Sequence, residues 1–154
     1  MRLVLAAIGR LRGGPLAAAF ADYAGRLEAA RWRLDVVECE ERRPLPPAGR
    51  MAREAEMLRA AIPAGGYAVA LDERGKTLSS AEFASRLGRL REAGRDVAFL
   101  IGGADGLDPR LRGEADLVLG MGAMTWPHML VRVMLAEQIY RAQSILAGHP
   151  YHRA

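Results

Sequence analysis

Glycines, methionines and a tryptophan gather in two loops that each follow an apolar run. The first loop spans residues 102–106 and the second spans residues 120–128. Glycine allows a backbone to approach a ligand closely, so main-chain amides and carbonyls here could hold an adenine and an amino-acid carboxylate. Met124 and Trp126 could then cover the ligand and exclude water. Tight turns alone would also explain the glycines, and the sequence leaves both readings open.

Two nucleotide-binding motifs are excluded by spacing. Residues 75–77 read Gly-Lys-Thr, like the end of a P-loop, but that motif requires glycine where Ala70 stands. The glycines of residues 102–106 have the wrong spacing for a dinucleotide fingerprint and do not follow the first strand. We therefore expect neither site.

The three histidines, His128, His149 and His152, all lie in the last 27 residues. Imidazole is a common metal ligand, but no carboxylate or cysteine stands at ligand spacing from them, so we expect no metal. His128 could be a packing residue at a helix start or a functional one. The final residues, 148–154, carry side chains that stack on bases and contact phosphates, although a solvated basic tail is the alternative.

Apolar runs and turn signals predict the elements that position these residues. Strands are expected at residues 2–8, 34–39, 67–71, 97–101 and 115–119, and helices at 16–31, 50–62, 81–93 and 129–146. Strands that alternate with helices predict an α/β fold, with a mostly parallel sheet flanked by helices, in one domain spanning residues 1–154. In such sheets, ligands bind beyond the carboxyl ends of the strands.

Two segments stand apart from this pattern. Residues 40–49 are charged and contain three prolines, so we expect an irregular, exposed loop. The helix at 129–146 is apolar nearly all round and must be covered on more than one side. In so small a chain a second subunit is the natural cover, which predicts a homodimer.

Composition constrains the class of protein. The chain has 154 residues and a net charge of +4, and 21 of its 22 basic residues are arginine. Arginine suits phosphate and base recognition, but an ordinary solvated surface is equally compatible with this charge. Cys39 is the single cysteine, and neither a convincing signal peptide nor a run of about 20 apolar residues is present. We expect a cytoplasmic protein with no membrane contact.

Several longer motifs carry a family resemblance that spans the chain and is densest after residue 96. They are Phe99-Leu100-Ile101-Gly102-Gly103 with Gly106-Leu107, Trp126-Pro127-His128 with Leu130-Val131-Arg132-Val133, Glu137-Gln138 with Tyr140-Arg141-Ala142, and His149-Pro150-Tyr151-His152-Arg153. Together they resemble the RlmH-type (YbeA-like) methyltransferases of the SPOUT class. Leu71-Asp72 and Gly75-Lys76 fit the same family. Ala104-Asp105, Trp126 and Met129 depart from its usual residues, which concerns pocket shape rather than backbone contacts.

The resemblance implies a homodimer with a C-terminal trefoil knot, a feature that general folding rules would have excluded. It implies S-adenosylmethionine as the cofactor, and N3 of a pseudouridine in 23S rRNA of the assembled ribosome as the methylated atom. The cofactor site carried over from the family consists of Leu71, Gly103, Gly122, Ala123, Met124, Thr125, Trp126 and Pro127.

The chemistry requires N3 of the pseudouridine to lose its proton, so a base or a stabilising cation is needed nearby. Tyr151, His152 and Arg153 are the candidate catalytic residues, with Arg132 and His128 as second choices. We expect His128, Arg132, Arg141 and His149 to contact RNA. Two other functions share these features, namely a non-catalytic RNA- or ribosome-binding protein and a SPOUT methyltransferase that acts on tRNA.

Overall fold

The computed structural model describes residues 1–152. Five strands and five helices follow one another along the chain. The strands are β1 (Leu3–Ile8), β2 (Leu34–Cys39), β3 (Tyr67–Thr77), β4 (Val97–Ile101) and β5 (Leu117–Gly120). The helices are α1 (Gly14–Ala29), α2 (Pro47–Ala60), α3 (Ser80–Glu92), α4 (Pro109–Glu114) and α5 (His128–Leu146).

The strands form one sheet in the order β2-β1-β4-β3-β5, and every neighbouring pair is parallel. This confirms the predicted α/β class. Leu3 pairs with Val97 at one end of β1, and Ala7 pairs with Ile101 at the other. The carboxyl ends of β1, β3, β4 and β5 therefore meet along one edge, where parallel α/β sheets bind their ligands.

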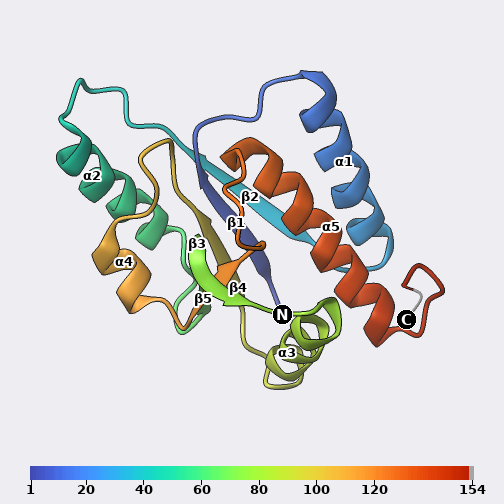
Figure 1. Cartoon of the computed structure of the whole chain (residues 1–154). Coiled ribbons are helices and arrows are strands. Elements are labelled where there is room, and N and C mark those ends of the chain that lie inside the picture. The colour runs from blue at the N-terminus through green and yellow to red at the C-terminus, as the bar shows by residue number, and fades with distance from the viewer. Residues whose placement is uncertain (153–154) are drawn as a thin grey trace.

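Helices cover both faces of the sheet (Figure 1). Alternate strand residues point to opposite faces, so each face has its own core. Leu5, Val69 and Phe99 belong to the core beneath α1, α3 and α5, whereas Ala6 and Leu100 belong to the core beneath α2 and α4. The strands are buried along β1 and β4 on both faces, which explains why they read as continuous apolar runs.

Three elements differ from the sequence prediction. Helix α2 begins inside the expected loop, because Pro47 stands in the first turn of a helix, where its missing N–H is not needed. Strand β3 continues to Thr77 after an irregularity in which Leu71 and Lys76 both pair with Leu119. Helix α4 was not predicted, although Asp108 caps it by accepting hydrogen bonds from the N–H groups of Arg110 and Leu111.

The start of α3 was predicted correctly. Ser79 and Glu82 form a reciprocal capping box at this helix start.

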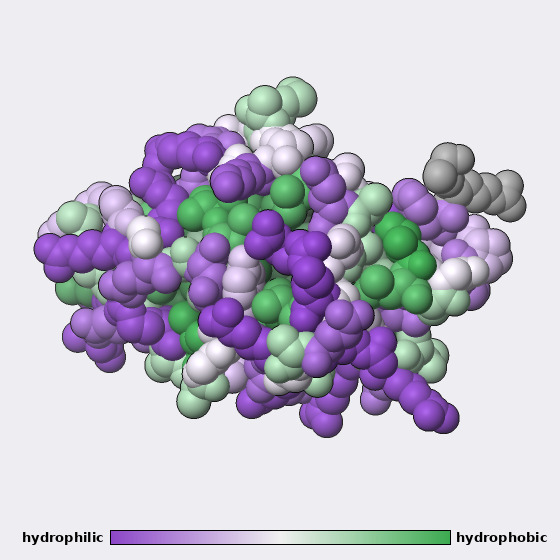
Figure 2. Space-filling model, turned by 90° about the horizontal axis from the view of Figure 1, so that it is seen from below, coloured by the Kyte–Doolittle hydropathy of each residue, from purple (hydrophilic) through white to green (hydrophobic). Residues whose placement is uncertain are grey.

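Seen from below, toward the end of the molecule where the chain begins, the surface consists mostly of hydrophilic side chains with smaller hydrophobic areas between them (Figure 2).

Candidate active site

A cavity of about 460 Å³ lies at the carboxyl ends of β3, β4 and β5. Its walls come from the ends of β3, β4 and β5, the loop after β4, one residue of α4, the segment that links β5 to α5, and the first turn of α5. The lining residues are Leu71, Asp72, Glu73, Arg74, Ile101, Gly102, Gly103, Ala104, Asp105, Gly106, Leu107, Arg112, Leu119, Met121, Met124, Thr125, Trp126, Pro127, His128 and Val131.

The loop after β4 is a tight turn that only glycine can make at its first position. A Cβ added to Gly102 would lie 2.7 Å from the carbonyl carbon of Gly106, and the N–H of Gly106 donates to the carbonyl of Gly103 at 3.0 Å. Gly106 adopts a φ of +83°, a conformation that side chains disfavour. The turn brings main-chain atoms of residues 102 and 103 directly to the cavity.

A second pair of glycines joins the ends of β3 and β5. A Cβ on Gly75 would lie 2.6 Å from the backbone nitrogen of Gly120. The two backbones therefore touch at this point with no side chain between them, which fixes the β3 wall of the cavity against the start of the β5–α5 segment.

An ion pair closes one side of the cavity. Arg112 on α4 donates to Asp72 at 3.0 Å, and Asp72 also accepts from the N–H of Arg74 at 2.9 Å. Burial alone would raise the pKa of Asp72, but these two donors outweigh burial and lower it. Asp72 is thus an anion that holds Arg112 at the cavity. Sequence analysis missed Arg112 because α4 itself was not predicted.

The segment between β5 and α5 forms the outer wall. The indole N–H of Trp126 donates to the carbonyl of Met121 at 3.2 Å, and the hydroxyl of Thr125 donates to Glu73 at 2.5 Å. Met124 is 71% exposed and Trp126 is 39% exposed. These two apolar side chains border the cavity and still face solvent, so a ligand or a second surface could cover them.

Glu54 on α2 lies behind the glycine turn and is 7% exposed. Its carboxylate would be 3.3 Å from a Cβ on Gly103, and its Oε2 is buried without a hydrogen-bond partner among the described residues. Burial raises the pKa of Glu54, while nearby Arg50 opposes this rise. Sequence analysis gave this residue no role.

The predicted cofactor residues fall into two groups. Leu71, Gly103 and the run 124–127 line the cavity together. Gly122 instead lines a second groove of about 450 Å³ beside α3 and α5, and Ala123 is exposed and belongs to neither lining. Gly122 has a φ of +113°, so its glycine is required by the backbone conformation at this turn.

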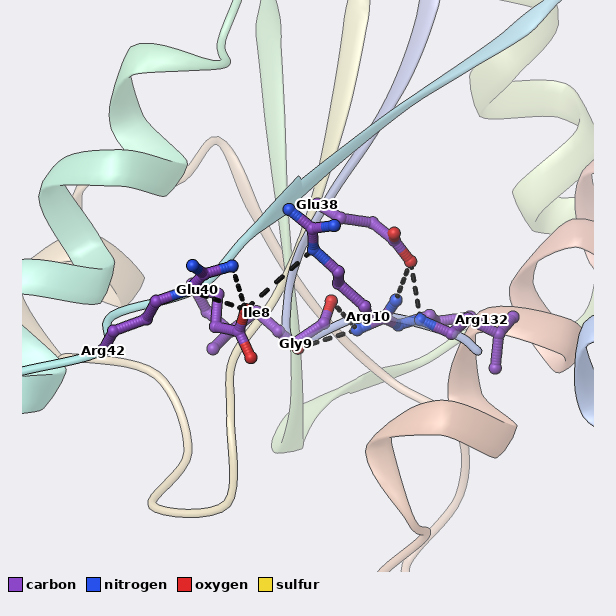
Figure 3. A network of polar contacts seen from close by, with 8 residues as sticks. Ile8, Gly9, Arg10, Glu38, Glu40, Arg42 and Arg132 are labelled. Atoms are coloured by element: carbon purple, nitrogen blue, oxygen red, sulfur yellow. Dashed lines mark hydrogen bonds and ion pairs between the residues drawn. The ribbon is translucent and has the colours of Figure 1, made fainter. Parts of the chain in front are cut away.

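Arg132 does not have the exposed position that an RNA contact requires. It is 1% exposed, and its guanidinium donates to the carbonyls of Ile8 and Gly9 and to Glu38, at 2.7, 3.0 and 2.9 Å (Figure 3). Burial lowers the pKa of Arg132, and Glu38 counteracts this effect. The prediction that Arg132 binds RNA is therefore wrong, because all of its ordered contacts are internal.

His128 stands at the first position of α5 and lines the cavity. Its Nδ1 is buried and has no hydrogen-bond partner within residues 1–152. Of the three histidines, His128 is the one that this chain places in its own cavity.

The tail turns back along α5. The Tyr151 hydroxyl donates to Glu137 at 3.0 Å, and the Tyr151 ring packs on Tyr140 with 4.7 Å between centroids. Arg141 pairs with Glu137 at 2.5 Å and lies 3.4 Å from Nδ1 of His152. Arg153 lies outside the described residues. Glu137 is nine residues along α5 from His128, about 13 Å at the rise of an α-helix.

Tyr151 and His152 are therefore not part of the cavity of their own chain. Burial raises the pKa of the Tyr151 phenol, and hydrogen bonding with Tyr23 and Glu137 adds to the rise. Among the other predicted RNA contacts, Arg141 is held in its ion pair, while His149 is exposed and accepts from the N–H of Tyr151 at 3.2 Å.

No group of three or more histidine, cysteine, aspartate or glutamate residues within 1–152 is arranged to hold a metal ion. None of the helices in that range combines the length and apolar character needed to cross a membrane.

The geometry can be compared with known proteins. A family model described as "Predicted SPOUT methyltransferase" matches residues 1–152. The chain belongs to the SPOUT methyltransferase family. It is 56% identical to a protein of Paracoccus denitrificans over 99% of both chains, and 57% identical to one of Rhodospirillum centenum over the whole of both. Both relatives are named "Ribosomal RNA large subunit methyltransferase H".

Solved structures with distant sequences show similarity of the fold alone. A methylase family protein from Haemophilus influenzae has a TM-score of 0.56 at 10% identity, covering 99% of this chain and 70% of that one. Another from Neisseria gonorrhoeae has a TM-score of 0.53 at 14% identity, covering 98% and 94%.

Proposed function

We propose that this chain transfers a methyl group from S-adenosylmethionine to N3 of a pseudouridine in 23S rRNA of the assembled ribosome, in the cytoplasm. The observation that carries the proposal is the cavity in which Leu71, Gly103 and residues 124–127 converge. The full-length similarity to relatives named for a large-subunit rRNA methyltransferase supports the substrate class.

The cavity fits such a cofactor in size and in lining. Its volume of about 460 Å³ lies within the range of small-molecule sites. The Gly102 turn presents main-chain donors and acceptors where an adenine could bind. Leu71, Leu119 and Val131 contribute apolar surface to the same cavity. When bound, S-adenosylmethionine supplies a methyl group activated by its sulfonium.

The protein must also handle the proton of N3. Tyr151 is unsuited as the base because its raised pKa keeps the phenol protonated and directed at Glu137. An imidazole is suited to this role near neutral pH. His128 is available in the cavity of the same chain, whereas His152 could reach a cavity only from another chain.

A homodimer would bring the tail to a cavity. The second groove, lined by Leu78, Phe83, Met121 and Met134 among others, is open on the α3 and α5 side and gives an apolar surface for a second copy. Helix α5 packs on α1 and α3, and its predicted need for cover is only partly met within one chain. We infer that the partner's tail completes each site. The family's trefoil knot is part of the same proposal, and the direct contact between Gly75 and Gly120 supports a tightly crossed backbone there.

Calorimetry with S-adenosylmethionine and methyl-transfer assays test the function. We expect micromolar cofactor binding and transfer to ribosomes that lack the modification, with little transfer to naked rRNA or tRNA. Absence of cofactor binding would favour a non-catalytic RNA-binding protein. Transfer to tRNA alone would assign the chain to a different SPOUT substrate.

A mixing experiment tests the shared site. One variant carries Gly102→Ala in the turn, and the other lacks residues 151–154. At a cofactor concentration well below the weakened Kd of the Gly102→Ala variant, each should show little activity alone. Co-expressed heterodimers should regain activity, because one of the two sites then has an intact turn and an intact tail. If verified heterodimers do not regain activity, the tail does not act in the partner's site, and its role lies in its own chain or in folding.

A further inference from the structure

The loop between β1 and α1, residues 9–13, starts at the rim of the cavity. The Ile8 side chain would touch a Cβ on Gly103 at 3.1 Å, and a Cβ on Gly9 would lie 3.8 Å from the ring of His128. Gly103 and His128 both line the cavity. The end of β1 therefore packs between the Gly103 turn and His128, and the loop that follows β1 starts next to the cavity.

Arg132 and Glu38 hold this loop in place from within. Arg132 binds the carbonyls of Ile8 and Gly9, and Glu38 accepts both from Arg132 at 2.9 Å and from the N–H of Leu11 at 2.7 Å (Figure 3). The N–H of Gly9 also donates to the carbonyl of Cys39 at 2.7 Å. Four hydrogen bonds thus hold the backbone of Ile8, Gly9 and Leu11 in place, even though the loop is at the surface.

The same loop carries two arginines directed to solvent. Arg10 is 51% exposed in its side chain and has only a long ion pair of 3.9 Å with Glu40, which Arg42 also contacts at 3.3 Å. Arg12 is exposed and has no ion pair or side-chain hydrogen bond among residues 1–152. Elsewhere, arginines such as Arg43 and Arg59 have carboxylate partners below 3 Å.

Burying a guanidinium is costly unless it is hydrogen-bonded. Arg132 donates two hydrogen bonds to the start of the loop and one to Glu38, which also binds Leu11, while its Nε has no partner among residues 1–152. An ordered loop binds with less entropy loss than a mobile one. Guanidinium groups without a close carboxylate favour phosphate oxygens, which they bind through paired hydrogen bonds.

We propose that residues 9–13 form an RNA-binding element, in which Arg10 and Arg12 contact phosphates next to the target nucleoside and Arg132 positions them through Glu38. This inference rests on the proposed function and adds the surface that holds the RNA. Glu38 and Arg132 are positioning residues, since neither reaches the RNA itself.

The double variant Arg10→Ala/Arg12→Ala tests the surface. The control Arg33→Ala/Arg89→Ala removes the same charge from exposed positions at the opposite end of the strands. With ribosomes lacking the methyl group, we expect KM to rise about tenfold or more for the first pair and about twofold or less for the control. The slope of log binding constant against log salt concentration should become shallower, equivalent to roughly one to two fewer released counterions.

Cofactor affinity and kcat at saturating ribosomes should remain at wild-type values in both pairs. Equal KM values for the two pairs would overturn the inference and leave the proposed function standing. Absence of cofactor binding or methyl transfer in the wild type would instead refute the proposed function itself.

Variants of Glu38 test the positioning. Glu38→Ala should raise KM without lowering kcat and speed hydrogen exchange of the Leu11 amide, whereas Glu38→Gln keeps an acceptor oxygen and should restore both. Wild-type KM and exchange in a folded Glu38→Ala would overturn the positioning role. If Glu38→Ala fails to fold, Glu38→Gln gives the test instead. A raised KM together with slow exchange of the Leu11 amide would show that KM does not depend on the order of the loop, and would overturn the positioning role.

Discussion

At Gly102 no side chain can be accommodated, because three backbone atoms of residues 106 and 107 lie within 2.9 Å of a Cβ placed there. Backbone contacts of this kind cannot relax by a side-chain rotation, so any larger residue must open the turn. The main-chain groups offered to the cofactor depend on that turn. A single methyl group at residue 102 should therefore affect binding more than the removal of a lining side chain.

Gly102→Ala should weaken S-adenosylmethionine binding by about tenfold or more, equivalent to at least ~1.4 kcal/mol. Gly25→Ala is the matched control, since a Cβ at this helical position meets nothing within 4 Å. The control should raise stability by about 0.5–1 kcal/mol and leave binding unchanged. Calorimetry and thermal unfolding measure both. Unchanged affinity in Gly102→Ala would contradict the role of the turn.

Glu54 predicts a pH dependence of stability. Its pKa is raised in the folded protein, so ionisation costs more when folded than when unfolded, and stability falls as the pH rises above the unfolded pKa toward the folded pKa. Glu54→Gln removes this penalty without changing shape. The variant should unfold at a higher temperature than the wild type at pH 8, and the difference should shrink toward pH 4. A constant difference across that range would argue against burial as the cause.

At the scale of elements, the sequence predicts most of the sheet because β1 and β4 are buried on both faces and read as unbroken apolar runs. It fails where single residues decide a boundary. Pro47 starts a helix where prolines had suggested a loop, and Gly75 lets β3 resume after a bulge. Arg112 was missed with its short helix, although Asp108-Pro109 is a recognisable helix start.

Some of the predicted site residues lie around one cavity, for a related reason. Leu71, Gly103 and residues 124–127 follow strand ends and converge because parallel strands end together. Neither the burial of Arg132 nor the placement of Tyr151 on Glu137 could be predicted, since both depend on how α5 packs. A sequence pattern gives residue types at a helix position but not the groups that surround them.

In the segment before α2, the ion pair of Glu41 with Arg43 should persist to low pH. The side chain and N–H of Arg43 hydrogen-bond to Glu41 and lower its pKa from 4.5 to about 2. A depressed carboxylate pKa stabilises the fold fully above the unfolded value, and this contribution is lost as the pH falls through about 2. Carbon-13 NMR should show Glu41 ionised at pH 3. Titration near its ordinary value would show that the contacts with Arg43 do not persist in solution.

At the scale of the molecule, the proposed dimer surface is apolar and the proposed RNA-binding surface is basic. The loop between β1 and α1, which carries Arg10 and Arg12, starts at the rim of the cavity, while the apolar groove lies beside α3 and α5. A homodimer that covers the groove leaves the loop free for RNA. Dimerisation and RNA binding should therefore be separable by mutation.

Light scattering should give a mass twice the 16.7 kDa of one chain. Met134→Asp places a charge in the apolar groove and should yield monomers without methyl transfer, since desolvating an unpaired charge opposes association. The control Val36→Asp alters a 44% exposed apolar residue on β2 and should remain dimeric. A monomeric wild type with full activity would exclude the shared site.

The carbonyl of Cys39, which anchors Gly9, belongs to the one thiol-bearing residue of the chain. Burial raises the pKa of that thiol, so little thiolate is present at neutral pH and alkylating reagents should react slowly with the native protein. Cys39 is partly buried, and opening of the corner between β1 and β2 would expose its sulfur further and speed the reaction. The alkylation rate of Cys39, measured by mass spectrometry, should therefore report local opening at the edge of the site without any introduced label.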